Sequence, residues 1–149
     1  MQQIKINRGF TLIELMVTIA VLAIIATLAA PSFSNMILKQ NLNKSTQELI
    51  LVMNEARAKA ALDRREITLQ LNTSAVANTP TQFNWMPQGK AVLKAGAPNS
   101  VVFLPTGLIK NANSDTSFMI CDQASGSVSK TVVISRMGTV QQVVEGTCA

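Results

Sequence analysis

The sequence predicts an α+β protein: a long, bent N-terminal helix, membrane-spanning in its first half, packed on an antiparallel β-sheet or sandwich head. Three observations predict this class. An almost unbroken apolar run covers residues 10–30. Apolar residues then recur at spacings of three and four as far as Ala60, which is the period of a helix with one buried face. After Arg65, short segments alternate between apolar and polar residues, as strands do.

The apolar run has the length of a transmembrane helix. Residues 10–30 would rise roughly 31 Å as a helix, about the thickness of the hydrocarbon core of a bilayer. Lys5 and Arg8 precede the run, and an acidic residue, Glu14, lies inside it. A cleaved secretory signal peptide would explain the basic residues, but its apolar stretch is normally shorter, roughly 7–15 residues, and lacks an acid. A retained membrane helix explains the length. Both interpretations stay open on these residues alone.

The helix is predicted to continue beyond the membrane. Pro31 follows the run, and because proline removes a backbone hydrogen bond we expect a helix kink at this residue. Residues 31–65 read as an amphipathic helix that continues into the head. Its predicted buried face comprises Leu38, Leu42, Ser45, Leu49, Val52, Ala56 and Ala60. On the solvated face, Glu55 and Lys59 are spaced for an ion pair across one helical turn, worth a few tenths of a kcal/mol.

Residues 66–149 are predicted to form a β-rich globular head. The expected strands are residues 67–71, 83–86, 100–104, 118–121, 131–135 and 139–144. Turn-rich stretches such as Pro105-Thr106-Gly107 and Met137-Gly138 separate them. Short strands at this spacing, with no second helical segment, indicate antiparallel pairing.

The composition argues against an enzyme. The chain has no histidine, which excludes Ser–His and Cys–His nucleophile pairs and histidine-containing metal sites. Gly89-Lys90 lacks the glycine spacing of a phosphate-binding loop. Asp115 and Asp122 flank a predicted strand and could approach each other, although solvated surface positions explain them as well. Trp85 is expected to pack against the sheet. We therefore expect no catalytic residue, no metal, no cofactor and no small-molecule substrate.

The two cysteines, Cys121 and Cys148, suggest a disulfide, because their number is even and the chain is expected to be exported. Such a bond would stabilise the fold by roughly 3–4 kcal/mol and would hold the C-terminus against an interior strand. Two buried thiols or a metal pair are the alternatives, and the metal pair has no histidine to complete it.

The junction Gly9-Phe10-Thr11-Leu12-Ile13-Glu14, between a short basic segment and the apolar run, resembles the leader junction of type IV pilins and type II secretion pseudopilins. The resemblance implies that a prepilin peptidase cuts between Gly9 and Phe10. Residues 1–9 would leave as a class III leader peptide, and Phe10 would become the methylated N-terminus of the transmembrane helix, residues 10–30. It also implies that Glu14 pairs with the N-terminal ammonium of a neighbouring subunit, which gives the acid an opposite charge inside an apolar assembly.

The head is similar to that of the H-type minor pseudopilins and minor pilins. The similarity lies in Ala56-Arg57, in residues 102–105 with Gly107, and in Ile134-Ser135 with Gly138. It implies a structural minor pilin of a type IV pilus that primes assembly at or near the filament tip. Before assembly it would reside in the inner membrane with its head in the periplasm. Its partners would be other minor pilins or pseudopilins and the major pilin, contacted through the N-terminal helix. An H-type minor pseudopilin of a type II secretion system is the alternative, because both systems use the same leader and helix.

A pilus-associated DNA receptor for natural transformation is the second alternative. Receptors in this subfamily use an arginine-rich segment near the C-terminus, whereas residues 136–141 of this chain contain Arg136 alone. The net charge of +5 is modest. Because phosphate binding depends on several Lys and Arg contacts, DNA binding is not the favoured hypothesis.

Overall fold

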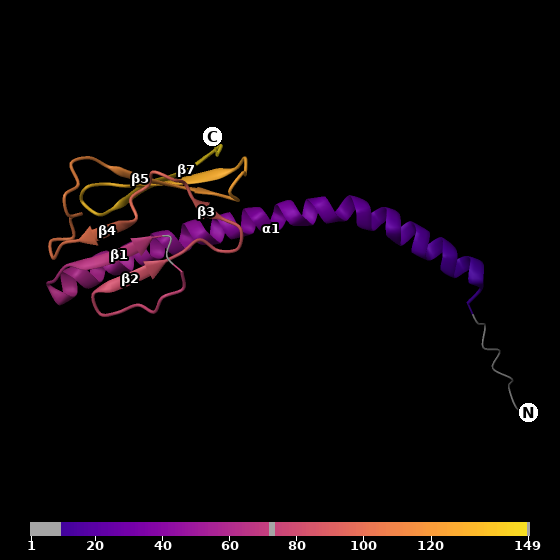
Figure 1. Ribbon diagram of the computed structural model, residues 1–149, viewed down its shortest axis with the longest axis horizontal. Helices are drawn as coiled ribbons and strands as arrows, with labels where there is room; N and C mark the ends of the chain where they lie inside the picture. Colours follow the sequence, from indigo (N-terminus) through magenta and orange to yellow (C-terminus); the bar gives the residue numbers. More distant parts are fainter. Residues whose placement is uncertain (1–9, 72–73, 149) are drawn as a thin grey trace, which may run out of the picture. The chain divides into compact units, whose positions relative to one another are not determined.

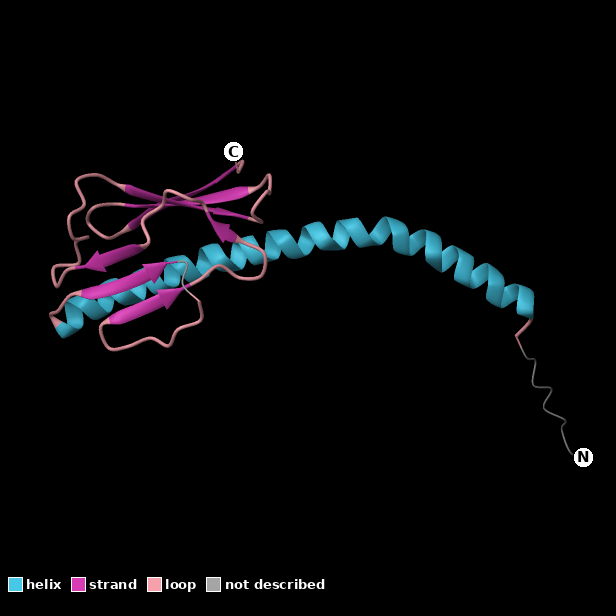
Figure 2. Cartoon of the chain, in the orientation of Figure 1, coloured by secondary structure: helices cyan, strands magenta, loops and turns pink. Residues whose placement is uncertain are grey.

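The computed structural model describes residues 10–71 and 74–148, and these residues form one helix and seven strands (Figures 1 and 2). The order along the chain is α1 (Leu12–Asp63), β1 (Ile67–Leu71), β2 (Gln82–Trp85), β3 (Val92–Leu93), β4 (Ser100–Phe103), β5 (Thr116–Cys121), β6 (Ser129–Ile134) and β7 (Val140–Gly146). This is the predicted α+β class. The described residues divide into two compact units between Met36 and Ile37, and α1 contributes to both.

Helix α1 begins and ends close to the predicted limits. It runs through Pro31, with helical residues on both sides, and the kink at this proline stays a prediction. At the C-terminal end Arg64 adopts a left-handed conformation with φ of 51°. The Arg65 amide then donates a hydrogen bond to the Ala60 carbonyl over 3.3 Å. A left-handed residue followed by this backward bond is a common way to end a helix, because it satisfies one of the last carbonyl groups.

The second half of α1 supplies one wall of the hydrophobic core of the head. Leu42, Ser45, Leu49, Ala56 and Ala60 are buried, as the three-four spacing predicts. Two further residues, Thr46 and Met53, are buried as well, while Leu38 and Val52, both predicted on the buried face, are only partly buried. The buried stripe is therefore wider than a strict three-four pattern, as is usual for a helix that covers a sheet.

Ion pairing on the solvated face of α1 differs from the prediction. Lys59 pairs with Asp63 over 3.2 Å, one turn further along, and not with Glu55. Arg65 also contacts the Asp63 carboxylate, at 2.8 Å. The acid near the helix end therefore gathers two cations, which compensate for its unfavourable position near the negative end of the helix dipole.

Two sheets complete the head. One has the strand order β2-β1-β4, and the other has the order β3-β5-β6-β7. All neighbouring strands are antiparallel except β1 and β2, which pair in parallel from Thr68–Gln82 to Leu71–Trp85. The segment between β1 and β2 is long enough to carry the chain back to the start of the sheet, as a parallel pair requires. Strand β3 was not predicted, because two residues between turns carry no periodic pattern.

Buried side chains from both sheets fill the space against α1. Phe103 and Phe118 are among the largest fully buried side chains, and Trp85 is buried too, as predicted. Cys121, the last residue of β5, forms a disulfide with Cys148, just beyond β7, with Cα atoms 5.9 Å apart. The predicted disulfide is thereby confirmed, and it fixes the C-terminal end of the four-stranded sheet.

Candidate functional site

The N-terminal end of α1 is set by a threonine cap. The Glu14 amide donates to Thr11 Oγ1 over 3.3 Å, and the Leu15 amide donates to the Thr11 carbonyl over 3.2 Å. Thr11 and Glu14 thus have the spacing of a capping box, in which a hydroxyl residue begins the helix and Glu follows three positions later. A hydroxyl residue followed three positions later by Glu is therefore a second signal in this motif, one for the start of a helix. Gly9 and the rest of the predicted leader lie outside the described residues.

From Phe10 to Met36 the chain presents an exposed apolar surface. All these residues are exposed, and the stretch is long and apolar enough to cross a membrane. Thr18 and Thr27 are the hydroxyl residues in the middle of the run. Each donates a hydrogen bond of 2.8 Å to the carbonyl three residues earlier, Leu15 and Ile24 respectively. Because the helix satisfies its own polar groups, its surface is compatible with lipid or with other apolar helices.

Glu14 is the exception on this surface. It is the only ionisable side chain between residues 10 and 38 of the sequence. Its carboxylate has no ion-pair partner within the described residues. Position in the first helical turn favours a negative charge, because the helix dipole is positive there. In an apolar environment, however, a lone carboxylate needs an opposite charge from another molecule.

A shallow apolar hollow of about 540 Å³ lies further along the same unit, lined by Ala26, Ala29, Ala30, Ser32, Phe33 and Met36. Ala26, Ala29, Ala30 and Ser32 have small side chains, which allow the backbone of another helix to approach closely, as in helices that associate within lipid. The exposed half of α1 therefore has two features suited to assembly with other helices, a hollow of small residues and a lone acid.

In the head, the structure brings three motif residues together. Arg57, half-buried on α1, donates from Nε to the Gly107 carbonyl over 3.2 Å. Gly107 and Gly138 occupy two tight turns with φ of 80° and 76°. A Cβ on Gly138 would contact the Gly107 carbonyl oxygen and would lie 3.1 Å from Arg57 Nε. The arginine therefore links the turn after β4 with the turn before β7, which gives these widely separated residues one structural role.

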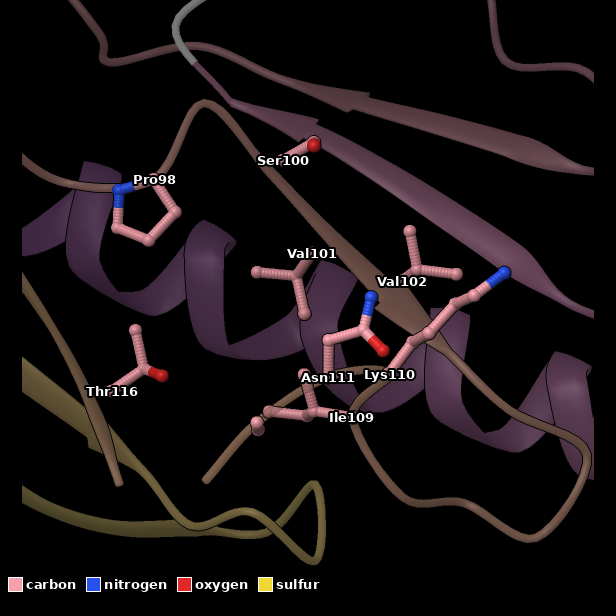
Figure 3. Close-up of a pocket in the computed structure, with 9 residues that line it drawn as sticks. Pro98, Ser100, Val101, Val102, Ile109, Lys110, Asn111 and Thr116 are labelled. Carbon is pink, nitrogen blue, oxygen red and sulfur yellow. The ribbon is translucent and has the colours of Figure 1, made fainter. Parts of the chain in front are cut away.

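Figure 3 shows the pocket beside β4, which has a volume of about 240 Å³. Its lining includes Ser100, Val102, Lys110 and Asn111. The Lys110 amine is already bound by both carboxylate oxygens of Glu66, at 2.9 Å each. The hydroxyl residues Ser100 and Thr116 also line the pocket, whose one cationic lining residue, Lys110, is thus held by the ion pair with Glu66.

The remaining candidates for chemistry do not converge. Asp115 precedes β5 and is exposed, whereas Asp122 follows that strand and is buried, with Oδ1 accepting from the Gln123 amide over 3.0 Å. A six-residue strand separates the two acids by roughly 20 Å, so they do not form a pair. No cluster of three metal-ligating side chains occurs among residues 10–71 and 74–148. Arg136 is exposed on the turn before β7.

Comparison with known proteins places these features in a family. The model of the prokaryotic N-terminal methylation motif matches residues 4–30. The model of the type II transport protein GspH matches residues 45–138, more than half of the chain. No curated protein matches the sequence significantly.

Among solved structures, the type IV minor pilin FimU of Pseudomonas aeruginosa strain PAO1, in its P21 crystal form, has 19% identity and a TM-score of 0.54 over 69% of this chain and 88% of that chain. A second crystal form of FimU, in space group P65, has 20% identity and a TM-score of 0.48 over 67% and 90%. The first likeness shows a shared pilin fold. The match to the type II transport protein GspH covers residues 45–138, from the second half of α1 to the turn before β7. The chain therefore belongs to the GspH family of minor pilins and pseudopilins, and it carries the N-terminal methylation motif.

Proposed function

We propose that this chain is a minor pilin subunit of a type IV pilus, which primes filament assembly and lies at or near the filament tip. The observation that carries the proposal is the lone Glu14 on the exposed, otherwise apolar first part of α1, which lies within the methylation motif matched over residues 4–30. A carboxylate in that setting is stabilised best by a cation supplied by another subunit.

The proposed assembly route assigns a role to each N-terminal residue. A prepilin peptidase cleaves after Gly9 in the inner membrane, and Phe10 becomes the methylated N-terminus. The Phe10 ammonium of one subunit then meets Glu14 of the next, while the head remains in the periplasm. The apolar hollow at Ala26, Ala29 and Ala30 receives a neighbouring helix in the filament core.

The match to the type II transport protein GspH supports a second candidate, an H-type minor pseudopilin of a type II secretion system. Both candidates use the same leader and helix. They differ in what fails when the gene is deleted: surface filaments in one case, and the release of secreted proteins in the other.

The decisive experiment deletes the gene and restores it as the native sequence or as Gly9→Val. Under the proposal, deletion reduces the number of surface filaments, and the native chain restores them with an N-methylated Phe10 detected by mass spectrometry. Gly9→Val leaves an uncleaved chain in the membrane and restores nothing. A normal filament count with impaired protein secretion would favour the pseudopilin, and a mature chain beginning near Pro31 would refute both candidates.

A further inference from the structure

Strand β7 has an unusual position in the head. It forms one edge of the four-stranded sheet, and six of its seven residues are exposed. Val143 and Val144 point to opposite faces of the sheet, yet both are more than 40% exposed. The other strands of four or more residues each bury at least two residues, because one face of each packs on the core. Only Val140, the first residue of β7, packs against the core, so the core does not account for the rest of the strand.

The other sheet edges in the described part of the head are covered or very short. At β2 the Asn84 amide donates to Asn78 Oδ1 over 2.8 Å, so the preceding loop caps that edge. At β4 the following segment folds back, and the Lys110 amide donates to the Val102 carbonyl over 2.8 Å. Strand β3 has only two residues. Edge coverage of this kind prevents unwanted strand pairing, and β7 lacks it.

The register identifies which backbone groups of β7 point outward. Ser129, Thr131 and Val133 of β6 lie opposite Gly146, Val144 and Gln142. Beyond the strand, the Cys148 amide donates to the Ser127 carbonyl, which marks this series as the hydrogen-bonded one. In an antiparallel pair the intervening residues direct their amide and carbonyl groups away from the partner. Those of Val143, Glu145 and Thr147 therefore face the open edge.

The open edge has few protective features. Strand β7 contains neither lysine nor proline, the usual residues that discourage pairing. Its one acid, Glu145, already pairs with Lys130 over 3.1 Å. A register irregularity opposite Val133 and Ile134 affects the first part of the strand, so the stretch from Gln142 onward pairs regularly. The disulfide at Cys148 holds the far end in place. The disulfide thus fixes a strand of which six residues are exposed.

We propose that the β7 edge is a docking site for an extended segment from the head of a different pilin-family subunit, which adds to the sheet as a further strand. The inference rests on the proposed function, because assembly through the apolar helices brings neighbouring heads together. An open row of amide and carbonyl groups recognises extended backbone and not a small molecule. Its uncharged neighbours Gln142, Val143 and Val144 suit a protein strand and offer no cation to a nucleic acid.

The test compares variants that differ at one outward-facing amide. Val143→Pro removes this donor and leaves the ladder to β6 intact, because the Val143 amide does not face β6. Val143→Ala keeps the amide and shortens the same side chain, so it is the matched control. Thr147→Pro and Thr147→Ala form a second pair. In each full-length variant, expressed in the bacterium that carries the gene, a photo-crosslinking residue replaces Gln142. Sheared filaments are then collected and cross-linked peptides are identified by mass spectrometry.

In the native and alanine chains we expect a cross-link from position 142 to an extended head segment of a different chain bearing the N-terminal methylation motif. The proline variants should lose this cross-link at least tenfold, while Trp85 fluorescence shows a head unfolding midpoint like that of the native chain. If Val143→Pro lowers that midpoint, the cross-linking of Thr147→Pro is compared with that of Thr147→Ala instead. Undiminished cross-linking in the folded proline variant, or cross-linking only to a second copy or to a non-pilin molecule, overturns the inference while leaving the proposed function standing. Absence of the native chain from filaments counts instead against the proposed function.

Discussion

At Gly138 the backbone conformation and the surroundings both exclude a side chain. Its φ of 76° is in the left-handed region, and a Cβ would contact the Gly107 carbonyl oxygen. Gly96 is a natural control, because its φ of 94° is also left-handed but nothing lies within 4 Å of the position that a Cβ would occupy. The two glycines therefore separate the effect of conformation from the effect of contact.

We expect Gly138→Ala to lower the free energy of unfolding by about 2–4 kcal/mol, and Gly96→Ala by only about 1–2 kcal/mol. The difference reports the collision with Gly107 and the displacement of Arg57. Trp85 is the only tryptophan and is buried in the head, so its fluorescence during urea denaturation of the full chain in detergent measures both variants. If both variants lose the same free energy of unfolding, the turns at Gly107 and Gly138 move apart freely enough to accommodate the added methyl group.

Asp63 connects stability to pH. Hydrogen bonds from Arg65 and then from Lys59 hold the pKa of this carboxyl below its ordinary value of 3.8. Because the folded state favours the ionised form, the stabilisation is present above that value and disappears as the pH falls through the lower folded pKa. Asp63→Asn should therefore lower the melting temperature slightly at pH 7 and have no effect at a pH below the folded pKa.

The appropriate control for Asp63→Asn is Glu55→Gln, which removes one negative charge from the same helix. Glu55 makes no ion pair within the described residues. Glu55→Gln should leave the melting temperature, measured by circular dichroism, unchanged both at pH 7 and at a pH below the folded pKa of Asp63. A pH-independent effect of Asp63→Asn would contradict the role of the ion pairs. High salt should weaken the effect at pH 7, since exposed pairs are screened.

Among the elements, β7 depends on the disulfide more than the other strands do. The bond joins residues 27 positions apart in the sequence, and closing a loop of that length removes denatured-state entropy worth roughly 3–4 kcal/mol. The strand buries little on either face, so it has few contacts that would hold it in place without the bond.

We expect the double substitution of Cys121→Ser with Cys148→Ser to destabilise the head by that amount and to expose β7 first. Hydrogen exchange measured by mass spectrometry should show faster exchange in residues 140–147, while β1 remains protected. Native chain treated with a reductant is the matched control and should behave in the same way. Uniform acceleration over the whole head would instead indicate that the disulfide supports the core.

The elements that were predicted well are those with a strong local pattern. Strand β1 matches its predicted bounds, because Ile67, Leu69 and Leu71 alternate with polar residues and all three are buried. The parallel pairing of β1 with β2 could not be predicted, since pairing direction depends on the path of the intervening loop and not on local periodicity. Lys59 has an acid one helical turn away on each side, Glu55 and Asp63, so spacing alone does not select its partner; in the structure the partner is Asp63, which Arg65 also contacts.

At the scale of the whole molecule, the N-terminal motif and the head differ in how readily they could be recognised. Phe10, Thr11 and Glu14 lie within five residues of one another, so the motif can be read directly from the sequence. Arg57, Gly107 and Gly138 are spread over more than half of the chain, and the sequence offered them only as separate matches. Their common role became apparent once the fold placed two turns against one arginine.

Glu14 has two roles that a single substitution can separate. Within its own chain it occupies the third helical position after the Thr11 cap, where glutamine serves as well as glutamate. Between chains, its negative charge is proposed to pair with the Phe10 ammonium of a neighbouring subunit. Glu14→Gln therefore preserves the cap and removes only the charge.

We expect Glu14→Gln to insert in the membrane and to be cleaved at least as well as the native chain, because the substitution removes a charge from an apolar segment. Entry into filaments should nevertheless fall at least tenfold. The substitution leaves the neighbour's ammonium unpaired in an apolar core, and breaking a buried pair costs about 3–5 kcal/mol. Immunoblots of sheared filaments against membrane fractions measure the ratio, with Glu55→Gln as the control for loss of charge. Native entry of Glu14→Gln into filaments would confine Glu14 to its own helix, and the register between subunits would then have to come from the apolar hollow and the heads.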